Sequence, residues 1–244
     1  MPEDEQLRLA RLVQSSLLPP PLSLPGLKLA ARVVPSVQVG GDFLDYFPLG
    51  PEQLGFYLGD VQGKGVEGAL YALLISGLMR GLHKTGVEPV EVLSALNRRL
   101  CFRSVPGKFC CLSYGVFDLA RRELSYASAG LPFPLLLRDR ILTRIELTGS
   151  PAGLFNPSEY DQVTVSLQAG DRLLFYTDGV SDCFRSVSAP HGDGEEELGE
   201  FFAADSGGSA EEQADRLVAH LQALQSSRGD LIFDDATLLL AHLP

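Results

Sequence analysis

Six strand-like segments follow one another after Gly107 with no helix between them, and this succession constrains the fold more than any other feature of the chain. Each is a short apolar run bounded by Gly, Pro, Asn, Asp or charged turn residues. The segments are residues 110–119, 123–130, 134–138, 141–147, 162–167 and 171–179. Because parallel strands need long crossover connections, usually helical, the pattern predicts antiparallel sheets and the α+β class.

The helical segments are grouped in blocks around these strands. Residues 66–84 carry apolar side chains at helical spacing and predict a largely buried helix, while residues 88–103 predict a second helix with basic residues in its last turns. The remaining expected elements are strands at 27–34, 43–49, 54–60 and 231–243 and a helix at 210–225. We expect residues 22–244 to form one domain, since a chain of this length needs no more.

Residues 5–18 predict an amphipathic helix that ends at the proline run 19–21. We therefore separate residues 1–21 as an N-terminal helix with a proline-rich linker. Two interpretations of the helix stay open: its apolar face joins a coiled coil, which would make the protein a homodimer through this helix, or it packs on its own domain. The residues on that face are Leu9, Leu12, Val13 and Leu17.

Charge and hydropathy exclude several classes of partner. The net charge is −11, and the stretch from Asp193 to Asp215 holds nine acidic residues and no Lys or Arg. We interpret this stretch as a solvated loop and helix start, with a substrate-facing flap as the alternative. No basic stripe for nucleic acid is present. The longest apolar stretch, residues 69–79, is shorter than the ~20 residues that span a bilayer, so we expect no membrane insertion.

The start of the chain is acidic and then amphipathic, unlike a secretory signal, so we expect a soluble cytoplasmic protein. Four cysteines without a CxxC pair are too sparse for a disulfide framework, and we expect them to be reduced. The four histidines share no ligand spacing with these cysteines, which disfavours zinc.

Aspartates recur where an expected strand meets a glycine-rich or tight turn. They lie in the four segments Gly40-Gly41-Asp42, Gly59-Asp60-Val61, Thr177-Asp178-Gly179 and Phe233-Asp234-Asp235. Carboxylates gathered at one sheet edge repel one another unless cations lie between them. All-oxygen ligands select hard cations, so Mg²⁺ or Mn²⁺ is favoured. Ordinary turn chemistry is sufficient to explain any one of these Asp residues alone. Four of them, each directly after an apolar strand, make that explanation weaker, and the spacing leaves both readings open.

The motifs GGDFLD, GDVQGKG, YTDGVSD and FDDATLLL, in this order, resemble the SpoIIE/RsbU-type bacterial branch of the PP2C (PPM) metal-dependent serine/threonine phosphatases. Flanking segments agree, among them LVQSSLLP, SAGLPFPLLL and GSPAGLF. The resemblance extends from about Ala10 to Leu243. It implies a PP2C-like αββα sandwich of two antiparallel sheets flanked by helices, with two Mn²⁺ or Mg²⁺ ions at one edge.

Carried over by motif, the resemblance implies that Asp60 bridges both ions, while the Val61 carbonyl adds a ligand to one. Asp178 and Asp234 would bind the other ion, and Asp42 would act directly or through a water. A water activated by the two ions would then attack the phosphorus. Candidate supporting or phosphate-contacting residues are Asp45, Lys64 and Asp235.

The sequence departs from the family pattern at two positions. Gln62 stands where eukaryotic members carry a His that is a candidate acid for the leaving alcohol, so protonation would fall to a metal-bound water. Leu131 stands where this branch usually has the His of an AGH motif. No clear match to the phosphate-binding Arg lies near Asp42; Lys64 is the nearest cation, and it is equally read as a solvated loop lysine.

The resemblance implies a protein phosphatase acting on a phosphorylated regulatory protein, of the STAS-type anti-anti-sigma class. A degenerate phosphatase fold that binds or regulates is the alternative that the changes at Gln62 and Leu131 leave open. A diguanylate cyclase is disfavoured because Phe43 follows Gly-Gly-Asp where an acidic residue is needed. A phosphatase for small molecules stays open as well.

Overall fold

The computed structural model describes residues 3–83, 86–185, 194–205, 207–227 and 234–244. Its contacts divide the chain into two compact units, each described here by itself. Unit 1 consists of Met1–Pro20, Val37–Leu131 and Leu147–Leu167. Unit 2 consists of Pro21–Ser36, Pro132–Glu146 and Gln168–Pro244.

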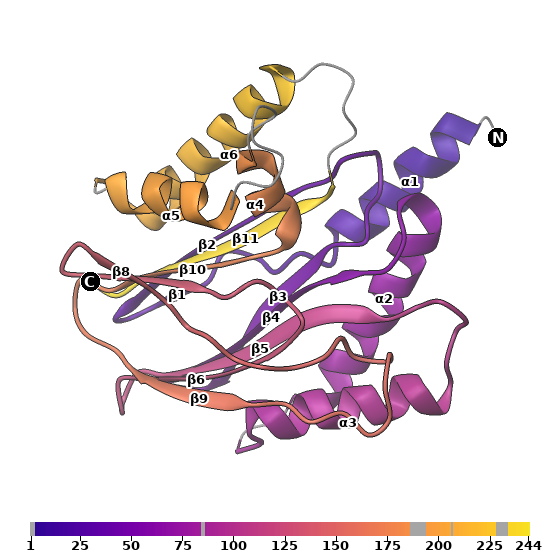
Figure 1. The fold of residues 1–244 in the computed structure, drawn as a ribbon, viewed down its shortest axis with the longest axis horizontal. Helices are drawn as coiled ribbons and strands as arrows, with labels where there is room; N and C mark the ends of the chain where they lie inside the picture. Colours follow the sequence, from indigo (N-terminus) through magenta and orange to yellow (C-terminus); the bar gives the residue numbers. More distant parts are fainter. Residues whose placement is uncertain (1–2, 84–85, 186–193, 206, 228–233) are drawn as a thin grey trace. The chain divides into compact units, whose positions relative to one another are not determined.

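Unit 1 is built on a five-stranded antiparallel sheet of order β3-β4-β5-β6-β9 (Figure 1). The strands are β3 (Phe43–Gly50), β4 (Gln53–Val61), β5 (Cys110–Asp118), β6 (Glu123–Ala129) and β9 (Gln162–Ser166). Its helices are α1 (Glu3–Ser15), α2 (Gly65–Leu82) and α3 (Pro89–Phe102).

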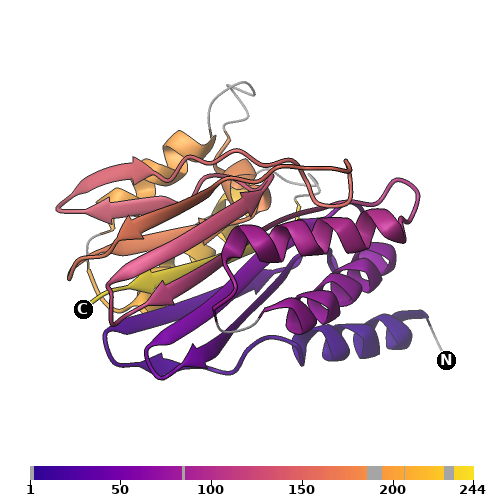
Figure 2. The ribbon, with the colours of Figure 1, turned by 90° about the horizontal axis from the view of Figure 1, so that it is seen from below.

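Helices α2 and α3 pack on one face of this sheet (Figure 2). The buried side of α2 contributes Ala72, Ile75 and Met79 to a core that also contains Leu93 and Leu96 of α3. A capping box in which Glu88 and Glu91 each bind the other's backbone N–H fixes the start of α3. Burial of these apolar stripes places the α2 N-terminus next to the end of β4, which leads into the candidate site.

Helix α1 is joined to unit 1 at its C-terminal end. The Gln14 side chain hydrogen-bonds the Gly40 backbone, and Arg80 of α2 donates to the Leu17 carbonyl oxygen. Leu12 and Val13, however, are 56% and 55% exposed. The end of the helix therefore contacts its own domain while part of its apolar face stays in solvent, and the boundary at residue 21 remains a prediction.

Unit 2 is built on a second antiparallel sheet, of order β1-β2-β11-β10-β7-β8. The strands are β1 (Ser23–Leu24), β2 (Leu27–Val34), β7 (Leu135–Arg138), β8 (Ile141–Arg144), β10 (Arg172–Tyr176) and β11 (Ala236–His242). Its helices are α4 (Asp178–Phe184), α5 (Gly194–Ala204) and α6 (Ala210–Ser227). The neighbouring strands β2 and β11 come from segments about 200 residues apart in sequence.

The predicted α+β class, with two antiparallel sheets and helices packed on them, is confirmed. Three local predictions were wrong. The strand expected over 141–147 ends at Arg144. The strand expected over 171–179 ends at Tyr176, and Asp178 begins helix α4 instead. The acidic stretch was expected to be a solvated loop before the helix at 210–225, but it contains helix α5, which buries Leu198 and Phe202 in the unit 2 core. Residues 193 and 206 of the acidic stretch lie outside the described residues.

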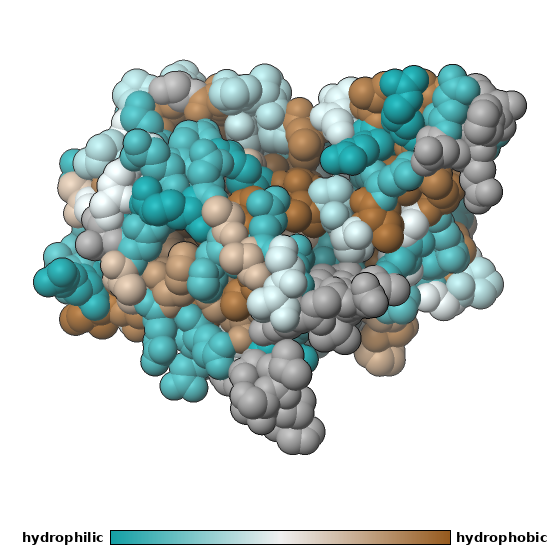
Figure 3. All heavy atoms as spheres, turned by 90° about the horizontal axis from the view of Figure 1, so that it is seen from above, coloured by the Kyte–Doolittle hydropathy of each residue, from teal (hydrophilic) through white to brown (hydrophobic). Residues whose placement is uncertain are grey.

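The charged residues of the acidic stretch nevertheless face outward: Glu196, Glu197 and Glu200 of α5 are exposed. The surface over α5 and α6 is mainly hydrophilic (teal in Figure 3). The last strand begins at Ala236, and residues 231–233 of the strand expected there lie outside the described part. None of the described helices combines the length and apolar character needed to cross a membrane.

Candidate active site

The strand register of unit 1 brings Asp42 and Asp60 to opposite positions. The β3–β4 ladder pairs Phe43 with Gly59, so its continuation by one residue sets Asp42 across from Asp60. Asp42 is buried at 3% exposure, and Asp60 is half-buried one residue before the end of β4. The structure thus brings together these two predicted ligands, with Val61 directly after them.

Glycines allow the backbone to approach the Asp60 carboxylate closely. A Cβ on Gly41 would lie 3.0 Å from Asp60 Oδ1 and 3.1 Å from the Gly63 carbonyl oxygen. A Cβ on Gly68 of α2 would lie 2.4 Å from that same Gly63 oxygen. Gly41, directly before Asp42, and Gly68, in the first turn of α2, therefore allow the compact turn 62–65 that follows the motif.

The pKa of the Cys110 thiol is affected by the negative charge of Asp42 and Asp60. Burial is the main cause that raises its pKa well above the usual value, and the neighbouring groups Cys111, Asp60 and Asp42 raise it further. Cys110 pairs with Val61 in the β4–β5 ladder. The two carboxylates and the buried thiol therefore share one neighbourhood at the end of β4.

Asp45 lies three residues after Asp42, on β3, and has a different partner. Its Oδ2 accepts a hydrogen bond from Arg80 Nε at 2.9 Å, and the Tyr57 hydroxyl is 3.3 Å from the same oxygen. Arg80 continues to the Leu17 carbonyl oxygen. Asp45 thus links β3 to α2 and to the chain after α1.

Lys108 is a residue at this site that the sequence did not single out. Its Nζ donates to the Gln62 carbonyl oxygen at 2.8 Å and pairs with Glu67 at 2.8 Å. Lys64, in contrast, is exposed at the N-cap of α2. Only the contact across 46 residues distinguishes Lys108, so no local pattern could have found it.

In unit 2, Asp178 is the first residue of α4, directly after β10. The preceding Thr177 is fully buried and extends the β10–β11 ladder through its N–H to the Thr237 carbonyl oxygen at 3.0 Å. A Cβ on Gly179 would lie 1.9 Å from the Asp235 carbonyl oxygen, so the turn around Asp178 lies directly against the 234–236 backbone. The structure thereby brings the third and fourth motifs together.

The pKa of Asp178 is raised above its usual value, first by burial and then by the carboxylates of Asp182 and Asp234. Asp182 follows Asp178 by one turn of α4 and forms an ion pair with Arg185 at 2.9 Å. Asp182 was not predicted as part of this group because α4 was not expected. Its four-residue spacing from Asp178, which puts both side chains on one helix face, is the signal that could have found it.

Asp235 is 3% exposed and accepts hydrogen bonds from the Ser36 backbone N–H at 2.7 Å and from the Ser36 hydroxyl at 2.9 Å. It therefore secures the chain after β2, whereas its neighbour Asp234 is the one that contributes charge near Asp178.

The donor set suits a hard divalent cation by its chemistry. Each unit holds motif carboxylates that lie in one neighbourhood, and a divalent cation would relieve their repulsion. Among the described residues, the charged groups that shift the pKa of Asp178 are the carboxylates of Asp182 and Asp234. Across the described ranges, no three Asp, Glu, His or Cys side chains are grouped as a ready-made metal site. The chemistry therefore fits Mg²⁺ or Mn²⁺, and the ligand set remains a prediction.

Comparison with known proteins gives the family. The family model "Stage II sporulation protein E (SpoIIE)" matches residues 50–244, which include the second, third and fourth motifs. The chain belongs to the SpoIIE family. Phosphoserine phosphatase RsbP of Bacillus subtilis (strain 168) is 30% identical over 183 residues, covering 72% of this chain and 45% of RsbP. These matches confirm the SpoIIE/RsbU-type branch of the PP2C phosphatases.

Solved structures show the same fold. The RsbU and RsbW domains of Rv1364c from Mycobacterium tuberculosis match with a TM-score of 0.75 and 29% identity, covering 91% of this chain and 61% of that one. The SiaA-PP2C domain of Pseudomonas aeruginosa matches with a TM-score of 0.80 and 21% identity, covering 99% and 97%. The predicted PP2C-like fold is confirmed. This SpoIIE-family chain spans about half the length of the curated relatives it matches.

Proposed function

We propose that this chain is a metal-dependent protein phosphatase that removes phosphate from phosphoserine or phosphothreonine. The observation that carries the proposal is the group around Asp178, where burial and the carboxylates of Asp182 and Asp234 raise the pKa of a motif aspartate in a SpoIIE-family chain. Such a group is costly to keep ionised unless a cation neutralises it. Perturbed carboxylates of this kind are typical of functional sites.

In this proposal, two Mn²⁺ or Mg²⁺ ions are held by Asp42, Asp60, the Val61 carbonyl, Asp178 and Asp234. When bound, such ions supply positive charge for the phosphate and lower the pKa of a water molecule. The chain's own contribution is positional. The β3–β4 register fixes Asp42 opposite Asp60, and Thr177 fixes Asp178 at the start of α4. Gln62, which follows Val61, has no acidic proton and therefore cannot act as a general acid.

We propose a phosphorylated regulatory protein of the STAS type as substrate, and a homodimer that uses the N-terminal helix. Support for the substrate class is the resemblance to the SpoIIE/RsbU-type branch, and support for the dimer is the exposure of Leu12 and Val13 on α1. Both go beyond what the family match states.

The test is hydrolysis of p-nitrophenyl phosphate and of a phosphoserine peptide with Mn²⁺, with Mg²⁺ and with EDTA. We expect metal-dependent turnover that EDTA abolishes. Asp178→Asn should lower turnover by about a hundredfold or more, because it removes a ligand charge and little volume. Asp139→Asn is the matched control, since Asp139 is exposed in the β7–β8 turn at φ 49°, a conformation that Asn tolerates.

A binding module with a degenerate phosphatase fold is the second candidate. Leu131 is 7% exposed and apolar where this branch usually carries a His, and the described carboxylates form no ready-made site. Absence of turnover with either metal, together with absence of metal binding by calorimetry, would favour this candidate over the phosphatase. Equal turnover by the Asp178→Asn variant and the wild type would refute the site assignment.

A further inference from the structure

Four large apolar side chains of unit 1 are exposed around the C-terminal end of α3. Phe102, the last residue of the helix, is 84% exposed, and Phe155 is 57% exposed. The set is Phe102, Val105, Leu154 and Phe155. Exposed apolar residues scattered singly need no explanation, whereas a group of them marks an interaction site.

Hydrogen bonds hold the 151–158 loop against α3 (Figures 1 and 2). The four exposed side chains lie on this loop, at the end of α3 and on the connection after it. The buried Asn97 donates from Nδ2 to the Phe155 carbonyl oxygen at 2.9 Å and accepts from the Gly153 N–H at 2.7 Å. The Cys101 thiol is 3.4 Å from the same Phe155 oxygen. A Cβ on Gly153 would lie 3.2 Å from Leu100 and 3.8 Å from the Lys108 carbonyl oxygen, so the loop touches both the helix and the connection after it.

Arginines accompany the apolar side chains. Arg98, Arg99 and Arg103 are exposed and lie three or four residues from Phe102 or from each other, the spacing of neighbours on a helix surface. No ion pair of theirs occurs among the described residues. Residues 92–117 contain four basic residues and no acidic one, in a chain of net charge −11. We call these three arginines and the four apolar residues the α3–loop surface.

The connection between α3 and β5, which carries Arg103 and Val105 of the α3–loop surface, contacts the turn that follows Asp60. Lys108 binds the Gln62 carbonyl oxygen, and the Gln62 N–H donates to the Phe109 carbonyl oxygen at 3.0 Å. The connection between α3 and β5 is thereby attached to the second motif. A protein that presents a phosphorylated residue at Asp60 would extend over this connection.

We propose that the α3–loop surface binds a segment of the phosphoprotein substrate that carries both acidic and apolar residues. The inference rests on the proposed phosphatase function and adds a substrate feature to it. Acidic side chains complement the three arginines, and apolar ones cover Phe102 and Phe155. An anionic membrane or a nucleic acid is disfavoured as the occupant, because three arginines on an acidic protein are few for either.

The experiment compares two phosphoserine peptides of equal length on the full chain. In one, the phosphoserine is flanked on both sides by Asp, Glu and Leu; in the other, by Ser, Gly and Lys. We expect kcat/KM to be higher for the acidic peptide. Replacement of Arg98, Arg99 and Arg103 by Gln should lower that kcat/KM by about tenfold, mainly through KM, and added salt should do the same. Phe102→Ala should lower it by about fivefold. Turnover of p-nitrophenyl phosphate should not change in either variant.

The matched control replaces Arg121, Arg122 and Arg140 by Gln, because these are also exposed arginines and the net charge changes equally. Arg121 follows the far end of β5, about 30 Å from Cys110 along the strand. Equal kcat/KM for the two peptides, or equal loss in the control variant, would overturn the proposal. So would an effect of the Phe102 and arginine variants on the oligomeric state or on binding to anionic vesicles without an effect on the acidic peptide.

Failure of the phosphatase proposal has a different signature. No turnover of p-nitrophenyl phosphate with any metal would refute the catalytic function alone. Binding of the fluorescently labelled acidic peptide, measured by anisotropy, then tests the α3–loop surface by itself. Weaker binding to the Phe102→Ala variant than to wild type would support it, and equal binding would overturn it.

Discussion

Thr177 and Thr237 are joined by two hydrogen bonds at the point where β10 ends and the Asp178 turn begins. The Thr177 N–H donates to the Thr237 carbonyl oxygen at 3.0 Å, and the Thr237 N–H donates to Thr177 Oγ1 at 2.9 Å. Both residues are fully buried. The side chain of Thr177 therefore replaces the next backbone acceptor of the ladder just where Asp178 turns away into α4.

The two threonines should respond differently to removal of the hydroxyl. Thr177→Val leaves the buried N–H of Thr237 without its acceptor, and we expect a loss of about 1–3 kcal/mol in the free energy of unfolding. Thr237→Val should be neutral or slightly stabilising, because Thr237 Oγ1 is buried and has no hydrogen-bond partner among the described residues. Urea denaturation of the two variants checks the contrast, and equal losses would contradict it.

The strands could be predicted from the sequence because their apolar runs are bounded by turn residues. The predicted strand over 27–34 matches β2, and the one over 43–49 differs from β3 by a single residue. Helix α4 could not be predicted, because seven residues are too few to show a helical period. Helix α5 was not predicted because three glutamates in its first turn made the segment look like a solvated loop.

Strand order and long-range contacts could not be predicted from the sequence, because they depend on residues that are far apart in the chain. β2 pairs with β11 across about 200 residues of sequence, and no local pattern in either segment identifies its partner. At the candidate site, the motifs predicted the aspartates, while Arg80 at Asp45 and Lys108 at Gln62 became visible only through contacts across tens of residues.

Two glycines of α2 offer a prediction about the motif that follows Asp60. A Cβ on Gly68 would lie 2.4 Å from the Gly63 carbonyl oxygen, whereas a Cβ on Gly77 meets nothing within 4 Å. Gly68→Ala should displace the 62–65 turn, lower the free energy of unfolding by about 1–3 kcal/mol and reduce turnover. Gly77→Ala should instead stabilise by about 0.5–1 kcal/mol, since Ala favours a helix interior. Thermal melting and p-nitrophenyl phosphate hydrolysis of both variants decide this, and equal melting temperatures would refute it.

The buried carboxylate of Asp171 anchors the β7–β10 pair in unit 2. It accepts from Arg138 Nε at 2.8 Å, from Arg138 Nη2 at 2.6 Å and from the Gln168 N–H at 2.8 Å. Asp171→Ala should cost about 2–3 kcal/mol, because the Gln168 N–H and the guanidinium lose their acceptor. Asp171→Asn retains one acceptor oxygen, so its loss should be smaller. Asp139→Asn in the adjacent turn should leave the urea midpoint unchanged, and an Asp171→Ala midpoint equal to that of the control would contradict the assignment.

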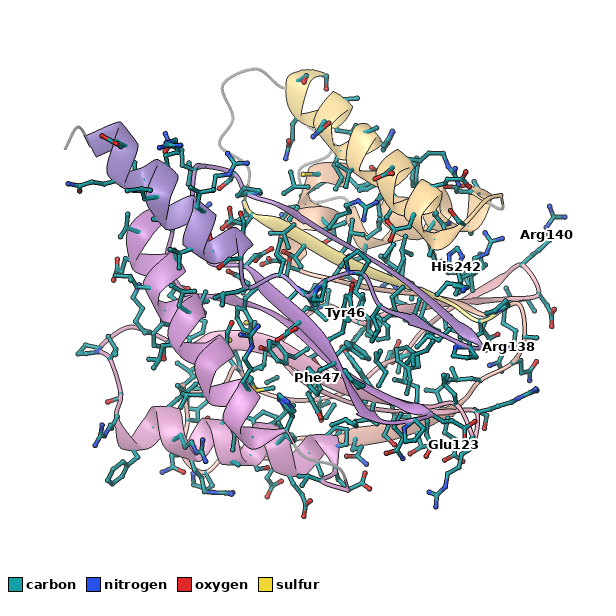
Figure 4. All side chains as sticks on the ribbon, turned by 180° about the vertical axis from the view of Figure 1, so that it is seen from behind. Tyr46, Phe47, Glu123, Arg138, Arg140 and His242 are labelled. Atoms are coloured by element: carbon teal, nitrogen blue, oxygen red, sulfur yellow. The ribbon has the colours of Figure 1, made fainter. Side chains whose placement is uncertain are left out.

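His242 makes the stability of unit 2 depend on pH. On β11 beside α6 (Figure 4), its Nε2 donates to Gln213 Oε1 at 2.8 Å. Burial, reinforced by the charge of Arg172, lowers the pKa of His242 from 6.5 to about 4. The unfolded chain therefore takes up a proton near pH 6.5, while the folded chain does so only near pH 4. The free energy of unfolding should consequently fall as the pH drops from 6.5 to 4 and level off below.

Because the ring keeps some contact with water, we expect this contribution to be about 1–2 kcal/mol. His242→Gln retains a donor for Gln213 and cannot titrate. The free energy of unfolding of the wild type minus that of the variant should therefore decrease from pH 7 to pH 4. Urea titrations at half-unit pH steps measure that difference directly. Because both proteins share the same carboxylates, their titration cancels in the comparison. A difference that is constant over this range would show that His242 is not held neutral in the folded state.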